Sequence, residues 1–220
     1  MTRHLRRLAL TAHISIAVGW IGAVAAYLVL VVAAMTIQGS QTLRAAWIAM
    51  ELIGWYLIVP LAVASLLSGL VMSLGTPWGL FRHYWTLISL LLTIIATTVL
   101  LQHMQTVSFF ARVAADASRP DVAGLRGALR GELLHAGVGL LVLLVIDALN
   151  VCKPKGMTAY GRRRASEASL VSSSTDVGRY APSVTSATGT PRWVRVVGLH
   201  AVGVAALFVI MHLFGGGGRH

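Results

Sequence analysis

The sequence predicts an all-α integral membrane protein, a helix bundle with five transmembrane helices. Hydrophobic residues make up 56% of the 220 residues and charged residues only 11%, far from the balance of soluble domains. Five apolar stretches are each long enough to cross a hydrocarbon core of about 30 Å at a helical rise of about 1.5 Å per residue. No catalytic motif appears in the sequence, so it indicates a membrane protein rather than an enzyme.

The five expected spans are separated by polar connections, of which the third and fourth are long. They are Leu8–Thr36, Ala46–Leu74, Tyr84–Met104, Leu133–Val151 and Trp193–Phe214. The first apolar run is longer than the roughly 7–15 residues of a signal peptide, so we expect a retained helix. Pro60 should distort the second span, because proline removes a backbone donor and clashes with the preceding turn. In these two spans Gly22-x-x-x-Ala26 and Ser65-x-x-x-Gly69 are expected to face neighbouring helices.

Three parts are expected in the chain. Residues 1–152 should form a four-helix transmembrane bundle, and residues 193–220 a fifth transmembrane helix with a short tail. Between them, residues 153–192 are a basic, Ser/Thr-rich loop with little apolar periodicity, which predicts disorder. Thr106–Glu132 should extend the third helix and, after a break at Arg119-Pro120, lie at the membrane surface.

The charge pattern predicts the topology. The formal net charge is +11, and 16 of the 18 basic residues are Arg, as in GC-rich bacterial genomes. With the N-terminus inside, twelve basic residues lie on the inner side and six on the outer side, which is the positive-inside arrangement. We therefore expect a plasma (inner) membrane protein with a cytoplasmic N-terminus and an external C-terminus.

The expected partners follow from the same pattern. The basic residues flank apolar spans, so the charge predicts contact with the lipid bilayer and, through the basic loop, with anionic headgroups rather than nucleic acid. Other membrane proteins or a second copy of the chain are the expected protein partners. Cys152 is the only cysteine, so no intramolecular disulfide or cysteine-based zinc cluster can form.

Ionisable residues inside the spans are the candidate functional residues, because they are costly in a bilayer. They fall into two layers: His13, Asp147 and His200 on the inner side, and Glu51, His103, His135 and His212 on the outer side, with Glu132 near it. Glu132 and His135 are three residues apart, the spacing of carboxylate-bridged metal sites in helix bundles. His13, Trp20 and Tyr27 follow at seven-residue steps and share one helix face.

Three hypotheses for these residues remain open. The first is ligation of haem or a metal such as copper, through His13 with His200 or through His103 with His135 and His212. The second is a proton or ion path, although only hydroxyls such as Ser65, Ser68, Thr93 and Thr97 interrupt the apolar centre of the spans. In the third the residues are structural, and the protein is a non-catalytic scaffold or accessory subunit.

Two short motifs resemble a known group. The stretch from Ala12 to Gly22 contains His13 and then Trp20-Ile21-Gly22, an opening similar to that of small bacterial membrane proteins. These include the copper-resistance D-type family and a related integral-membrane family of unknown function. The stretch from Ser68 to Leu80, followed by His83-Tyr84-Trp85, resembles actinobacterial members of the second family. The resemblance implies a multi-pass inner-membrane bundle, copper in one branch, and His13 as a candidate ligand.

Overall fold

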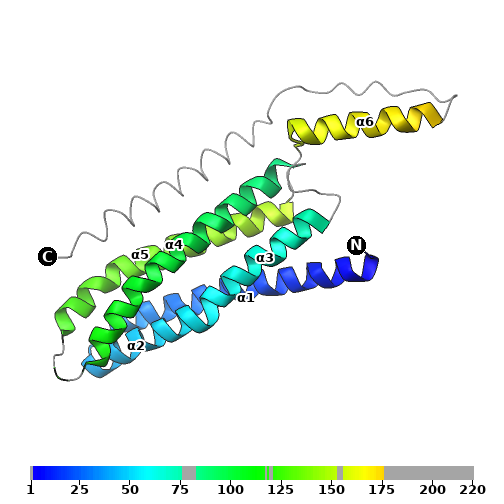
Figure 1. Ribbon diagram of the computed structural model, residues 1–220. Helices are drawn as coiled ribbons and strands as arrows, with labels where there is room; N and C mark the ends of the chain where they lie inside the picture. The colour runs from blue at the N-terminus through cyan, green and yellow to red at the C-terminus, as the bar shows by residue number, and fades with distance from the viewer. Residues whose placement is uncertain (1, 76–82, 117, 119–120, 153–155, 176–220) are drawn as a thin grey trace.

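The structure is a computed structural model that describes residues 2–75, 83–116, 118, 121–152 and 156–175. All its regular elements are helices: α1 Arg3–Thr36, α2 Ser40–Ile53, the π-helix η1 Gly54–Ile58, α3 Val59–Gly75, α4 Tyr84–Ala115, α5 Val122–Cys152 and α6 Ala159–Thr175. α2, η1 and α3 form one continuous helix. Figure 1 shows these helices side by side in a bundle, with α6 beyond its end.

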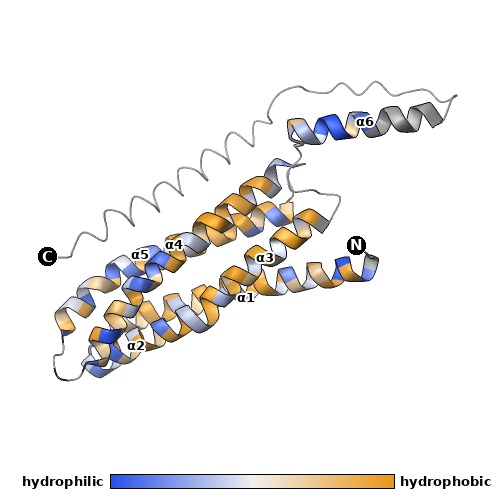
Figure 2. Cartoon of the chain, viewed as in Figure 1, coloured by the Kyte–Doolittle hydropathy of each residue, from blue (hydrophilic) through white to orange (hydrophobic). Residues whose placement is uncertain are grey.

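Four helices are long and apolar enough to cross a membrane: His4–Thr36, Ser40–Leu74, Tyr84–Ala115 and Val122–Cys152. Orange, hydrophobic residues dominate these helices in Figure 2. The chain is therefore a multi-pass membrane protein, and four of the five expected spans are confirmed. The fifth, Trp193–Phe214, lies outside the described residues, as does most of the expected division into a loop and a last helix.

The helices pack in antiparallel order, with α1 against α3 and α5, and α2 against α4. The largest fully buried side chains include Leu43, Trp47, Leu125 and Leu129, at the end of the bundle where α2 and α5 begin. At the other end α1 is more open, since none of its described side chains before Trp20 is buried. Because the described α1 side chains are buried only from Trp20 onward, we call the end where α2 and α5 begin the closed end and the end where α1 begins the open end. Trp85 and Leu149 of the neighbouring helices are nevertheless buried at the open end.

The start of α5 differs from the sequence prediction. The part of Thr106–Glu132 after Pro120 was expected on the membrane surface, but Val122–Glu132 forms the first three turns of α5. Asp121 begins this helix, because its carboxylate accepts a hydrogen bond from the Gly124 amide at 2.9 Å, as N-cap residues do. Leu125 and Leu129 then bury this extension in the bundle. The prediction failed because the many arginines here masked the apolar helical face.

Two arginines, Arg44 of α2 and Arg126 of α5, bind helix ends. Arg44 donates to the carbonyls of Ala114 and Ala115 at the end of α4, and Arg126 donates to those of Ile37, at 3.4 Å, and Gln38, at 2.8 Å, just after α1. The last carbonyls of a helix lack intrahelical donors and carry the negative end of its dipole. Arg44 and Arg126 therefore stabilise the closed end of the bundle.

The distortion predicted near Pro60 is the π-helix η1, which ends two residues before the proline. The Val59 amide donates to the Gly54 carbonyl, five residues earlier, which is the π-helical spacing. The wider turn accommodates the carbonyls that the proline ring would otherwise strike. It also points Trp55 at α4, where its indole donates to the Ser108 hydroxyl at 2.9 Å.

Of the two small-residue patterns, one faces a neighbouring helix in the structure and the other does not. Gly69 faces α1, since a Cβ there would lie 3.4 Å from His13 Cε1. Gly22 and Ala26 are exposed, and a Cβ at Gly22 would meet no described atom within 4 Å. The expectation that Gly22 and Ala26 face a neighbouring helix is therefore wrong for the described bundle, because α1 turns its Trp20–Tyr27 face inward instead.

α6 occupies part of the stretch that was expected to be disordered. The Gly161 amide donates to the Thr158 hydroxyl at 3.1 Å, which starts the helix in the manner of an N-cap. Figure 2 shows its first turns as hydrophilic. Low apolar content argues against burial in a core, but a helix still satisfies its own backbone hydrogen bonds, and this is what α6 does.

Candidate functional site

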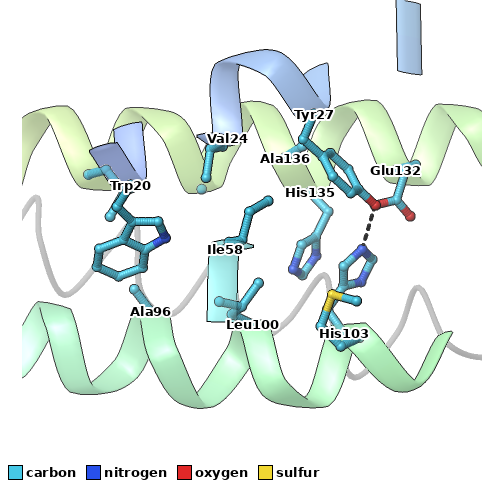
Figure 3. A pocket seen from close by; sticks show the side chains of 13 residues that line it. Trp20, Val24, Tyr27, Ile58, Ala96, Leu100, His103, Glu132, His135 and Ala136 are labelled. Carbon is cyan, nitrogen blue, oxygen red and sulfur yellow. Dashed lines mark hydrogen bonds and ion pairs between the residues drawn. The ribbon is translucent and has the colours of Figure 1, made fainter. Parts of the chain in front are cut away.

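A buried carboxylate lies at the centre of the candidate site. Glu132 is on α5 and only 3% exposed. Its Oε1 accepts a hydrogen bond from the Tyr27 hydroxyl of α1 at 2.6 Å and lies 2.8 Å from Nε2 of His103 on α4. Three helices thus meet at one carboxylate oxygen inside a membrane-spanning bundle (Figure 3).

His135 completes the arrangement one helical turn after Glu132. Its imidazole stacks on that of His103, with ring centroids 3.5 Å apart and an interplanar angle of 11°. We call Tyr27, His103, Glu132 and His135 the glutamate cluster. The spacing of Glu132 and His135 predicted their common face correctly, and the structure brings His103 and His135 together as expected.

A cavity of about 60 Å³ lies beside the glutamate cluster. Trp20, Ile58 and Met104 line it together with all four cluster residues. Figure 3 shows the Trp20 indole at the opposite end of the cavity from Glu132, with its nitrogen turned inward. This Nε1 is buried and has no hydrogen-bond partner among the described residues. The volume admits a few water molecules, each of which needs roughly 10–15 Å³ on this scale.

No metal site is shown among the described residues. Imidazole nitrogens bind metals along the ring plane, so two nearly parallel stacked rings do not direct their nitrogens at one point. Within the described ranges, no group of three or more His, Cys, Asp or Glu residues could hold a metal ion. Ligation through His13 with His200, or through His103 with His135 and His212, stays a prediction, because His200 and His212 lie outside the described residues.

His13 belongs to a second polar cluster, nearer the open end of the bundle. Its Nδ1 lies 2.8 Å from the Ser68 hydroxyl of α3. That hydroxyl donates to the Ser65 carbonyl at 3.1 Å, so it accepts from the imidazole. Asp147 of α5 interacts electrostatically with the same ring. We call His13, Ser68 and Asp147 the His13 cluster.

The comparisons with known proteins identify no family. No protein-family model, no curated protein and no solved structure matches the chain. The resemblance to copper-resistance D-type proteins and their relatives therefore stays a prediction. The statement that stands is the coarser one, a multi-pass helical membrane protein.

Proposed function

We propose that the glutamate cluster is an intramembrane proton-binding site, and that the protein handles protons within the bilayer. The observation that carries this proposal is the 3% exposed Glu132, whose Oε1 is in hydrogen-bond contact with both Tyr27 and His103. Side chains that bind and release protons thus converge in a bundle interior. Such clusters are typical of proton relays in membrane proteins.

Burial fixes how many protons the cluster can hold. An ionised carboxylate in a low-dielectric interior costs several kcal/mol unless its charge is balanced. One proton balances it, either on Glu132 itself or on His103 as its imidazolium partner. A second imidazolium at His135, with its ring 3.5 Å from the first, would be strongly repelled. The glutamate cluster therefore accommodates one exchangeable proton with two alternative positions.

The same contacts would also serve a scaffold, since hydrogen bonds between helices stabilise membrane bundles. A structural role and a proton-binding role differ in whether the cluster exchanges a proton with its surroundings. A scaffold needs a fixed protonation state, whereas a proton-binding site changes its state with pH.

Infrared difference spectroscopy of the protein in lipid, between acidic and alkaline pH, tests the proposal. We expect a buried carboxyl or imidazolium signal that Glu132→Gln removes. Glu51→Gln is the matched control, because Glu51 is also within a span but lies outside the cluster. A difference spectrum that Glu132→Gln leaves unchanged would overturn the proposal and favour the scaffold.

A further inference from the structure

We propose that the His13 cluster is the entry site for the proton bound at Glu132, and that the proton travels along the inner face of α1. This inference rests on the proposed function and adds the route by which the site is loaded. It joins two polar clusters that the fold places at different depths of one bundle.

The His13 cluster has the accessibility that an entry site needs. His13 is half-buried, and the α1 side chains between it and the N-terminus are mostly exposed. Its imidazole contacts Ser68 and interacts with Asp147. With Ser68 at one ring nitrogen and the Asp147 carboxylate nearby, the partly exposed imidazole is placed to exchange a proton at the end of the bundle where α1 begins.

The helix register aligns the two clusters on the same pair of helices. His13 and Tyr27 are fourteen residues apart on α1, about 21 Å along the axis. Asp147 and Glu132 are fifteen residues apart on the antiparallel α5, about 22 Å. Because α1 and α5 pack together, both helices contribute to both clusters at matching depth: α1 supplies His13 and Tyr27, and α5 supplies Asp147 and Glu132.

Buried polar atoms lie between the two depths. Trp20 is midway between His13 and Tyr27, and its Nε1 has no partner among the described residues. The Thr97 hydroxyl, next to the cavity residue Ala96, likewise has none there. Trp20 and Thr97 are 4% and 6% exposed. Buried polar groups of this kind are the usual binding points of internal water.

Further hydroxyls continue this row toward the His13 cluster. Ser65 and Thr93 are both 7% exposed, and the Thr93 hydroxyl donates to the Ser89 carbonyl at 2.8 Å. Ser65, Thr93 and Thr97 therefore face the bundle interior and not the lipid.

The proton balance of the transfer is simple. The His13 imidazolium releases one proton to the adjacent water, the water chain passes one proton along, and the Glu132 carboxylate accepts one. His13 then regains a proton from the aqueous phase. The Trp20 indole only donates hydrogen bonds, so it holds water in place and carries no proton.

A pH jump on the full protein in nanodiscs, followed by time-resolved infrared absorption of Glu132, tests the route. The amplitude of the signal reports proton binding, and its rate reports delivery. We expect His13→Gln to keep the amplitude and slow the rate by about 100-fold, the effect of removing a positioned proton-transfer group. His4→Gln, an exposed histidine on the same helix, should change neither.

Thr97→Val provides a second, smaller perturbation with an adjacent control. Thr98 is exposed and donates to the Ile94 carbonyl at 2.9 Å, so Thr98→Val should leave the rate unchanged while Thr97→Val lowers it. Wild-type rates in both His13→Gln and Thr97→Val, with full amplitude, would overturn the route but leave the proton-binding site intact. Loss of the pH-dependent signal in the wild type itself would overturn both.

Discussion

Tyr27 is the residue that ties α1 to the buried carboxylate. Its side chain is 4% exposed, and its hydroxyl donates to Glu132 at 2.6 Å. The hydroxyl has two effects: it joins two helices, and it stabilises negative charge on Glu132. The first effect belongs to stability and the second to proton affinity.

Replacing Tyr27 with phenylalanine should therefore change both properties. We expect Tyr27→Phe to lower the free energy of unfolding by about 1 kcal/mol, the usual worth of such a bond. The Glu132 carboxylate loses one of its hydrogen-bond partners, so its infrared band should shift. Thermal unfolding in detergent and infrared absorption of Glu132 measure the two effects.

Tyr56→Phe is the matched control, because the Tyr56 side chain is 79% exposed. It removes the same hydroxyl from another span and should leave both quantities at wild-type values. If the two variants have the same free energy of unfolding and the same infrared signal of Glu132, the Tyr27 hydroxyl does not bind Glu132.

The candidate site was predictable along each helix but not between helices. The three-residue step from Glu132 to His135 and the seven-residue steps from His13 to Tyr27 define faces, and the structure confirms that these faces point inward. That Tyr27 meets Glu132 depends on how far α1 and α5 slide along each other. Hydropathy does not encode this register, because Leu and Val pack equally well at many offsets.

At the scale of the helices, η1 places Gly54 directly against the Met104 side chain of α4. A Cβ added at Gly54 would collide with the Met104 methyl group, and Met104 is only 1% exposed and lines the cavity. The missing side chain at Gly54 therefore lets the Met104 thioether lie between the π-helix and the glutamate cluster.

Gly54→Ala should push Met104 into the cavity. We expect a loss of about 1–3 kcal/mol, as for other overpacked cores, and a displaced Glu132 infrared band. The second variant Met104→Ala, made on top of Gly54→Ala, should recover part of the loss by making room. Chemical or thermal unfolding in detergent measures these changes.

Gly22→Ala on α1 is the control for this glycine substitution, since a Cβ there meets no described atom within 4 Å. It should be neutral or slightly stabilising, because alanine has the higher helix propensity. A Gly54→Ala variant as stable as Gly22→Ala would mean that the close contact with Met104 is absent.

Helices were predicted best where the sequence is uniformly apolar, as in α1 and in the continuous helix that contains Pro60. Their ends were predicted less well. The first turns of α5 carry arginines on one face and the buried Leu125 and Leu129 on the other. The mean hydropathy of the segment is low because of the arginines, so it does not reveal the apolar face. α6 has almost no apolar face, so only its local capping at Thr158 indicates a helix.

At the scale of the whole molecule, the spanning helices are longer than the membrane requires. α1, α4 and α5 have 34, 32 and 31 residues, or about 46–51 Å at 1.5 Å per residue, against a hydrocarbon core of about 30 Å. Their ends must therefore tilt or project into the headgroups. Arg44 and Arg126 bind the ends of α4 and α1, so part of the positive charge of the chain serves helix capping.

The sole cysteine offers a direct test of the predicted orientation. Cys152 is exposed at the end of α5, and α5 runs antiparallel to α1, so Cys152 and the N-terminus share one end of the bundle. The twelve-to-six distribution of basic residues predicts that this end is cytoplasmic. A membrane-impermeant maleimide should therefore label Cys152 in inverted vesicles and not in intact cells.

Ser118 provides a labelling position at the opposite end of the bundle. It is exposed between α4 and α5, and its amide donates to Asp116 at 2.9 Å, a contact that cysteine preserves. Ser118→Cys in a Cys152→Ser background should be labelled in intact cells only. A reversed pattern would invert the topology, and labelling of both sites from one side would contradict the passage of α5 across the bilayer. With the predicted pattern, the His13 cluster opens toward the cytoplasm, so protons for Glu132 would be drawn from that compartment.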